Sequence, residues 1–421
     1  MNILLIGCGC VGKCFLELLY LEKCRVNNLT IIEPKVLPKW LKDMYPNVNH
    51  IKKGLTKSNM KRILEPFCNV AEEDKPMVVD VSVNTSTLNI VKLCSKIWKC
   101  NLINTSIEDY EMRHPEILDT DEKALYRRSL MCQNKKLEKM YGQAKTTALI
   151  LAGENPGEVS YKAIKGLCDY TEKFGNRVEK GLMRNKKYNL LARSLGLEKI
   201  HISEIDTQVP KRERPKDAFW GTWSVHGMIA EARDPVQISD RIIGERGMDV
   251  QEPSICVGYD GKPIHYTGSL VPHGEAYTIS NFLKCRDYMP DVYYVYCPSE
   301  MTRDSLDMLR ENDYKDIDDK LCYVLGQSDL KSGWDSVGCL LQFNCGRKWW
   351  CGSVLSLADV KKLGFKHSGP TPVQVAINML SSIRYIQKNK KEGLLEPEDL
   401  EYKSQLARSK DYLGKMYSLE V

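Results

Sequence analysis

An α/β fold made of two parts is predicted by three features of this 421-residue sequence. Short apolar runs alternate with helix-like segments through the first third, which is typical of a mostly parallel sheet with helices on both faces. After about residue 157 the rhythm changes, and alternating or aromatic strand candidates predict an antiparallel-rich α+β unit. Near the end, an apolar stripe at helical spacing predicts one long helix.

The chain opens with a strand, a glycine turn and a helix, and its glycines follow the pattern Gly7-x-Gly9-x-x-Gly12. Gly7 permits a tight turn, Gly9 lets a pyrophosphate approach the backbone, and Gly12 lets the helix pack closely on the strand. A second strand over 29–32 ends at Glu33, at the distance where a dinucleotide fingerprint has its acid. Since Glu33 accepts hydrogen bonds from ribose hydroxyls and repels a 2′-phosphate, this order predicts a Rossmann-type domain that binds NAD.

Three more strands are predicted in the first part, over 76–83, 101–107 and 146–152. Ligands of such sheets bind beyond the carboxyl ends of the strands. The polar residues expected there are Asn84, Thr85, Glu108 and Asn155.

The second part begins with a helix predicted over 159–174. The strands predicted after it cover 199–208, 219–225, 254–258, 291–297, 338–343 and 349–353. A final helix follows Gly369, with Thr371 expected as its cap and Pro372 at its first position. Its apolar stripe requires a buried host, and the first sheet is the expected one; the stripe is Val373, Ala376, Ile377, Leu380 and Ile383.

We therefore expect a Rossmann-type NAD-binding domain over 1–152 and 369–421, with the C-terminal helix returning to it. An α+β domain for substrate binding and dimerisation is expected to be inserted over 153–368.

The composition of the chain limits the classes of binding partner and the cellular compartment that we expect. The formal net charge of +6 is mild and spread along the chain, and the charged loop over 211–217 is best interpreted as a solvated connection, so no nucleic-acid partner is expected. No apolar stretch approaches the roughly 20 residues that span a bilayer, and the immediate strand leaves no room for a leader. Sixteen cysteines without a C-x-x-C pair indicate small buried hydrophobes in a cytoplasmic protein, and no metal site.

Five segments place polar or aromatic residues among apolar neighbours, over 153–160, 200–208, 221–231, 271–280 and 333–341. The joint run of N-P-G, I-H-I-x-E-x-D-T-Q, T-W-S-V-x-G and P-H-x-E-x-x-x-I closely resembles the homospermidine synthases, from the first strand to about residue 415. The resemblance implies a layout related to saccharopine dehydrogenase, a homodimer, and NAD as a cofactor that borrows and returns a hydride. It also implies polyamine substrates: an aminobutyl group passes from putrescine or spermidine to putrescine.

A diamine is dicationic in water, so its pocket must supply negative charge. The resemblance implies that Trp223 holds a cationic amine on its ring face, that Asn155 orients a neutral amine, and that His273 shuttles protons with a pKa near neutrality. The expected catalytic residues are Trp223, His273, Asn155, Glu231 and Asp335. The expected substrate-binding residues are Glu108, Glu204, Asn84 and Glu275, and the expected cofactor contacts are Gly7, Gly9, Cys10, Val11, Gly12, Glu33, Val83, Thr85, Thr105, Asn155 and Pro156.

Three positions depart from the family pattern and leave the preferred diamine open. Asn84 and His226 stand where acids are typical, and Trp220 replaces a smaller polar residue and is expected to narrow the entrance to the pocket. His201 is interpreted as structural or solvent-facing, because it alternates with isoleucines.

Two alternative functions remain at this stage. A reductive condensation of the saccharopine or carboxynorspermidine type needs an arginine for a carboxylate, and Arg303, Arg241 and Arg246 are candidates outside any matching motif. A non-catalytic NAD-binding sensor is the other alternative, and the retained acids argue against it.

Overall fold

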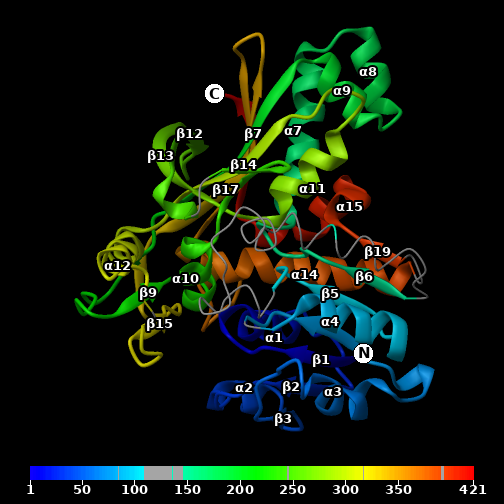
Figure 1. Cartoon of the computed structure of the whole chain (residues 1–421), viewed down its shortest axis with the longest axis vertical. Helices are drawn as coiled ribbons and strands as arrows, with labels where there is room; N and C mark the ends of the chain where they lie inside the picture. Colours follow the sequence, from blue (N-terminus) through cyan, green and yellow to red (C-terminus); the bar gives the residue numbers. More distant parts are fainter. Residues whose placement is uncertain (84, 109–134, 136–145, 244–245, 316, 390–392) are drawn as a thin grey trace.

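Two seven-stranded sheets, one above the other in Figure 1, organise the molecule. The computed structural model describes residues 1–83, 85–108, 135, 146–243, 246–315, 317–389 and 393–421. In this part of the chain, no helix is long and apolar enough to cross a membrane.

The first sheet is parallel throughout, with the strand order β19-β6-β5-β4-β1-β2-β3. Its strands are β1 (Asn2–Ile6), β2 (Asn28–Ile32), β3 (Asn49–Ile51), β4 (Met77–Asp80), β5 (Leu102–Asn104), β6 (Thr147–Leu149) and β19 (Gly393–Leu395). Strands β5 and β6 end earlier than predicted, so residues after Asn104 and Leu149 are free to form loops at the carboxyl edge of the sheet.

Both faces of the first sheet are buried, as parallel sheets require. Ile3 and Leu5 of β1 belong to one apolar cluster, and Leu4 and Ile6 belong to another on the opposite face. The surrounding helices are α1 (Cys10–Leu21), α2 (Lys39–Met44), α3 (Met60–Cys68), η1 (Glu72–Asp74), α4 (Thr87–Lys92) and the π-helical η2 (Leu93–Trp98).

The second sheet is mixed, with the order β12-β13-β14-β7-β17-β18-β20, and only β14 and β7 are parallel neighbours. Its strands are β7 (Leu197–Asp206), β12 (Gln251–Val257), β13 (Pro263–Val271), β14 (Asp291–Cys297), β17 (Trp334–Phe343), β18 (Lys348–Ser356) and β20 (Lys415–Glu420). The long helix α7 (Glu158–Phe174) packs on β17 and β18, and α11 (Gly274–Leu283) packs on β14.

Smaller elements complete this half of the molecule. Its short strands are β8 (Val209–Pro210), β9 (Phe219–Gly221), β10 (Val236–Ile238), β11 (Arg241–Ile243), β15 (Cys322–Val324) and β16 (Leu330–Ser332). Its other helices are α8 (Arg177–Arg184), α9 (Tyr188–Ser194), α10 (Val225–Arg233), η5 (Gly247–Asp249), α12 (Glu300–Glu311), α13 (Leu357–Lys362), η6 (Pro397–Asp399), α15 (Tyr402–Ser409) and η7 (Lys410–Tyr412).

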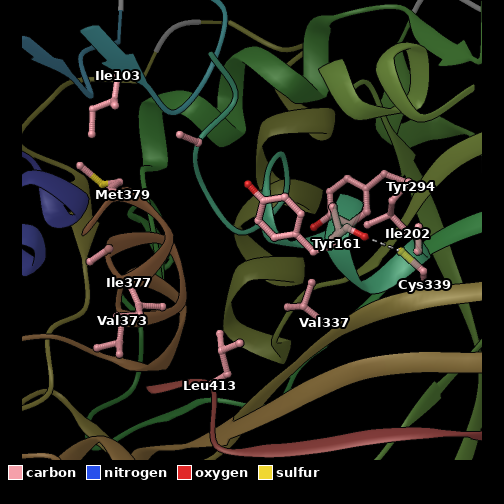
Figure 2. Packing of buried hydrophobic residues seen from close by; sticks show 14 of the residues in the cluster. Ile103, Tyr161, Ile202, Tyr294, Val337, Cys339, Val373, Ile377, Met379 and Leu413 are labelled. Atoms are coloured by element: carbon pink, nitrogen blue, oxygen red, sulfur yellow. Dashed lines mark hydrogen bonds between the residues drawn. The ribbon is translucent and has the colours of Figure 1, made fainter. Parts of the chain in front are cut away.

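Helix α14 (Pro370–Lys388) lies between the two sheets and packs against α1. Its predicted apolar stripe is buried, and Figure 2 shows Val373, Ile377 and Met379 on the same side of the core as Ile103 of β5. The predicted cap is wrong: the helix begins with Pro370 after Gly369, because proline already has a helical φ and lacks an N–H group. The hydroxyl of Thr371 instead donates to Asp335, 2.6 Å away.

The C-terminal strand differs from the expected domain division. Residues 369–421 were all expected in the Rossmann-type domain, but β20 pairs antiparallel with β18 of the second sheet, where Lys415 lies opposite Val354. The reason is apolar burial, since Tyr417 and Leu419 pack against the cluster around Trp350.

Candidate functional site

A cavity of about 140 Å³ lies between the carboxyl edge of the first sheet, the start of α14 and the second half of the molecule. Ten of the predicted site residues line it: Val11, Val83, Thr105, Glu108, Asn155, Pro156, Glu204, Trp223, Glu231 and His273. Among the described residues, no lysine or arginine contributes to its wall. Predicted residues that lie outside the wall are Gly7, Gly9, Cys10, Gly12, Glu33, Thr85, Glu275 and Asp335, and Asn84 lies outside the described residues.

The glycine loop fits a dinucleotide phosphate. Gly7 has a φ of +86°, and a Cβ on Gly12 would lie 2.6 Å from the Gly7 carbonyl oxygen, so both positions require glycine. A Cβ on Gly9 would meet no protein atom within 4 Å, which leaves the loop open on the side that a phosphate would approach. No side chain caps α1, so its first N–H groups are available to an anion.

Glu33 lies beside this loop, as the fingerprint predicts. Its Oε2 accepts the Cys8 N–H at 2.8 Å and its Oε1 accepts the Lys35 N–H at 2.9 Å. The carboxylate is thereby held at the end of β2, where a bound dinucleotide would present its adenosine ribose.

The loop after β4 is supported by a buried carboxylate. Ser82 Oγ donates to Asp80 Oδ1 at 2.6 Å, Asn104 Nδ2 donates to Asp80 Oδ2 at 3.1 Å, and Thr85 Oγ1 lies 2.8 Å from Ser82 Oγ. Burial raises the pKa of Asp80 to about 6. Thr85 therefore belongs to the support of this loop, while Val83 reaches the cavity.

Glu204 is a buried carboxylate of the cavity wall, with 2% of its surface exposed. It sits near the end of β7, and its Oε2 accepts hydrogen bonds from Asn155 Nδ2 and, at 2.8 Å, from the Tyr294 hydroxyl. Burial raises the pKa of Glu204 to about 8, although these two hydrogen bonds oppose the shift.

His273 is clamped by two carboxylates. Its Nε2 lies 3.4 Å from Glu231 Oε1 and its Nδ1 lies 3.1 Å from Glu275 Oε1. Burial alone would lower the pKa of His273, but the charges of Glu275 and Glu231 outweigh it and raise the pKa to about 10. A pKa in this range departs from the prediction of a shuttle that titrates near neutrality, because a carboxylate next to each ring nitrogen favours the charged form of His273.

Helix α10 carries Glu231 and begins just after Trp223. Ser224 caps the helix by accepting the Gly227 N–H at 3.1 Å. A Cβ on Gly227 would lie 3.0 Å from Trp223 Cζ3, so this glycine leaves space for the indole beside the first turn.

Asp335 and Glu108 approach the cavity in different ways. Asp335 is fully buried on β17, and Thr371, a cavity residue, donates a hydrogen bond to its Oδ2. Burial, followed by the charge of Glu204, holds the pKa of Asp335 well above its usual range. Glu108 lines the cavity directly and accepts a hydrogen bond from Ser106 Oγ at 2.9 Å.

Trp220 and His226 do not have the predicted effect on the pocket. Trp220 belongs to a separate apolar cluster with Met301 and Leu325, because β9 turns its side chain toward α12. His226 lies outside the cavity wall, and its Nε2 is 3.5 Å from Asp319.

His201 is structural, which was one of the two alternatives predicted for it. It is 2% exposed, and its ring nitrogens lie 3.0 Å from Ser254 Oγ and 2.7 Å from Gln342 Nε2. Burial lowers the pKa of His201 to about 3.

The arginines of the alternative reaction lie elsewhere. Arg241 pairs with Asp291 at 2.6 Å, Arg246 pairs with Asp313 at 3.4 Å, and neither they nor Arg303 line the cavity. The described wall therefore offers no guanidinium to a substrate carboxylate.

Among the wall residues that sequence reasoning missed, four carry chemically active side chains: Glu154, Tyr294, Thr371 and Asp234. Glu154 forms a buried ion pair with Lys162 of α7, and its Oε2 has no hydrogen-bond partner in the described structure. The alternation of β14 could have indicated Tyr294, since Val292, Tyr294 and Tyr296 share one face of that strand.

Three comparisons place these features among known proteins. Residues 3–149 match the model of the saccharopine dehydrogenase NADP binding domain. Two homospermidine synthases, from Mesorhizobium japonicum and Blastochloris viridis, are each 26% identical over 98% of this chain, which spans 88% and 89% of their lengths. These relatives confirm the resemblance predicted from the sequence motifs.

Solved structures agree on the fold. The homospermidine synthase of Legionella pneumophila in complex with NAD has a TM-score of 0.83 and 23% identity, over 100% of this chain and 91% of that one. The saccharopine dehydrogenase of Saccharomyces cerevisiae has a TM-score of 0.56 and 12% identity, over 100% of this chain and 99% of that one. The predicted two-part α/β architecture is therefore confirmed.

Proposed function

We propose that this chain catalyses the homospermidine synthase reaction, the NAD-dependent transfer of an aminobutyl group from putrescine or spermidine to putrescine. The observation that supports this most strongly is the cavity where the glycine-loop half meets buried carboxylates, with no lysine or arginine in the described part of its wall. A wall of that charge suits an aliphatic di- or polyamine, and the nearly full-length relatives carry the same enzyme name.

The cofactor part would hold NAD through the open Gly9 loop, the start of α1 and Glu33. The matching family model is named for NADP, but the carboxylate of Glu33 beside the loop favours a free 2′-hydroxyl. When bound, NAD⁺ would supply the hydride acceptor for the amine-bearing carbon and later the donor that reduces the new imine.

Glu204 would take the proton that the reacting ammonium must lose. A protonated amine has no lone pair to assist loss of hydride, so the substrate nitrogen must first become neutral. In this step the ammonium N–H bond breaks and an O–H bond forms on Glu204, whose burial raises its pKa to about 8, close to what such a transfer requires. Asn155, bonded to the same carboxylate, would orient the neutral amine.

The remaining charge of the substrate would be held by Trp223, Glu231 and Glu108, which line the same cavity. A desolvated cation on an indole face gains about 2 kcal/mol. His273, held by Glu231 and Glu275, would fix the orientation of Glu231 and moderate the negative charge around it.

The test combines purified protein, NAD⁺ and putrescine, with homospermidine and ammonia measured by mass spectrometry. Formation of both without accumulation of NADH is the expected result. Accumulation of NADH without condensation would indicate a plain amine dehydrogenase instead. Net consumption of NADH with an amino acid and an aldehyde would favour the reductive alternative.

We also propose a cytoplasmic homodimer, on the resemblance alone. Light scattering coupled to size-exclusion chromatography is expected to give twice the chain mass of 48.2 kDa. A mass of 48.2 kDa for active protein would reject the dimer.

A further inference from the structure

The Tyr294 hydroxyl touches the carboxylate to which the proposed function assigns proton transfer. Tyr294 is 3% exposed on β14, the parallel neighbour of β7, and lies two residues out of register with Glu204, which pairs with Tyr296. Its hydroxyl donates to Glu204 Oε2 at 2.8 Å, and its ring lies 4.5 Å from the ring of His273.

The two hydrogen-bond donors to Glu204, Asn155 and Tyr294, both donate to the same carboxylate oxygen. Asn155 Nδ2 and the Tyr294 hydroxyl each donate to Oε2, which leaves Oε1 for a ligand in the cavity. Burial and the nearby charge of Glu204 hold the pKa of Tyr294 well above its usual range, so the phenol keeps its proton and remains a donor. The carboxylate is therefore fixed in rotation at one end of the cavity.

We propose that Tyr294 is a positioning residue for proton transfer: it holds Oε2 of Glu204, so that Oε1 faces the substrate ammonium and accepts its proton. This inference rests on the function proposed above. In the step, the ammonium N–H bond breaks and a Glu204 O–H bond forms. The proton is returned when the C–N bond of the departing ammonia or diamine breaks.

Several titratable groups surround Glu204 and contribute to the electrostatic environment that sets its pKa. They are Asp206 on β7, Tyr294 and Tyr296 on β14, His273 before α11, Glu231 on α10, Asp335 on β17 and Cys256 on β12. Only Tyr294, of these, donates a hydrogen bond to Glu204 among the described residues. Removing its hydroxyl withdraws stabilisation from the carboxylate form alone, so the pKa of Glu204 should rise.

The adjacent residue provides a matched control. Tyr293 is also 3% exposed on β14, but it points to the other face of the sheet, and its hydroxyl donates to Glu252 Oε1 at 3.1 Å. Tyr293→Phe therefore deletes the same atom from the same strand without touching the cavity.

The experiment measures kcat and KM for putrescine in the NAD⁺-loaded protein from about pH 6 to 10. Tyr294→Phe should move the acidic limb of the kcat/KM profile upward by about one pH unit. It should lower kcat at neutral pH roughly tenfold and change KM less than kcat. Tyr293→Phe should leave the profile in place. In a Glu204→Gln background, Tyr294→Phe should have no further effect, since its action passes through that carboxylate.

Each other outcome overturns the inference. An unmoved acidic limb, a shift equal to that of Tyr293→Phe, or an additive loss in the Glu204→Gln background would reject it. Unfolding of Tyr294→Phe under conditions where Tyr293→Phe folds would show a structural role instead. If the wild type forms no homospermidine, the proposed function fails. The inference is then judged by calorimetry, where putrescine binding to the NAD⁺-loaded protein must show the same shift.

Discussion

The two sides of the cavity offer their ligands different chemistry. On the first-sheet side, the glycine loop next to the cavity wall presents backbone: a turn shaped by Gly7 and Gly12, the uncapped start of α1, and the carboxylate of Glu33, which accepts hydrogen bonds from backbone N–H groups. The second-sheet side presents side chains, and three of them are the carboxylates of Glu204, Glu231 and Asp234. The glycine loop depends on the absence of side chains at its glycines. The carboxylates of the second-sheet side depend on hydrogen bonds or ion pairs that compensate their charge.

The difference has an energetic consequence. Backbone N–H groups at a helix start are polar whether or not a ligand is bound, so a phosphate site made from them adds little cost to folding. Buried carboxylates destabilise the folded chain unless they are paired, hydrogen-bonded or protonated. We therefore expect substitutions on the second-sheet side to affect stability and activity together, and substitutions in the loop to separate them.

The largest expected effect is on the buried ion pair of Lys162 and Glu154. Lys162 is fully buried, and it also donates to Ser353 Oγ at 2.7 Å and to the Val337 carbonyl at 3.2 Å. Lys162→Met removes the cation and leaves the carboxylate behind, which should lower the free energy of unfolding by about 3–5 kcal/mol. Chemical denaturation monitored by tryptophan fluorescence measures this change.

Lys165→Met is the control for this variant. Lys165 lies one turn further along α7 and pairs with Asp169 at 2.6 Å, but both side chains are about one-third exposed. Since solvent screens such a pair, the loss should be under about 1 kcal/mol. If both variants lose the same free energy of unfolding, the buried ion pair contributes no more to stability than the partly exposed pair, and the prediction is rejected.

The next largest effect is expected in the glycine loop, where one substitution should weaken NAD⁺ binding without changing the stability of the fold. A Cβ on Gly9 contacts no protein atom, so Gly9→Ala should leave thermal unfolding unchanged while it weakens NAD⁺ binding at least about tenfold in calorimetry. Gly12→Ala should lower both the unfolding temperature and the affinity for NAD⁺, because its Cβ would overlap the Gly7 carbonyl. Unchanged NAD⁺ affinity in Gly9→Ala would show that the phosphate lies elsewhere.

The smallest effects are expected at the cation-binding wall. Trp223→Ala and Glu231→Gln should each lower kcat/KM for putrescine by roughly tenfold, which equals about 1.4 kcal/mol. His226→Ala should change it less than about twofold, because His226 lies on the same helix as Glu231 but outside the cavity. Wild-type rates in the first two variants would reject the assignment of the wall.

What could be predicted from the sequence was local or carried by motifs. The glycine loop, Glu33 and the apolar stripe of α14 each follow from spacing along a few turns or strands, so their positions were predictable. Glu204, Trp223 and His273 converge on one cavity as expected from the resemblance.

The remainder depends on contacts between distant segments. Lys162 carries no signal in the sequence, because its partners Glu154, Val337 and Ser353 come from three different parts of the chain. The raised pKa of His273 comes from Glu275, two residues along the chain, and also from Glu231, which comes from a separate helix, α10. The return of β20 to the second sheet is decided by pairing with β18, which no local pattern reveals.

The order of the strands bears on how the protein is made. Strand β19 completes one edge of the first sheet beside β6, and α14 covers α1, yet both follow six of the seven strands of the second sheet in sequence. During translation, the amino-terminal sheet must therefore wait on the ribosome with an open edge and an uncovered apolar face until residues 370–395 have emerged. A strand edge and an apolar face that stay open during synthesis are surfaces at which a nascent chain is prone to associate with other chains.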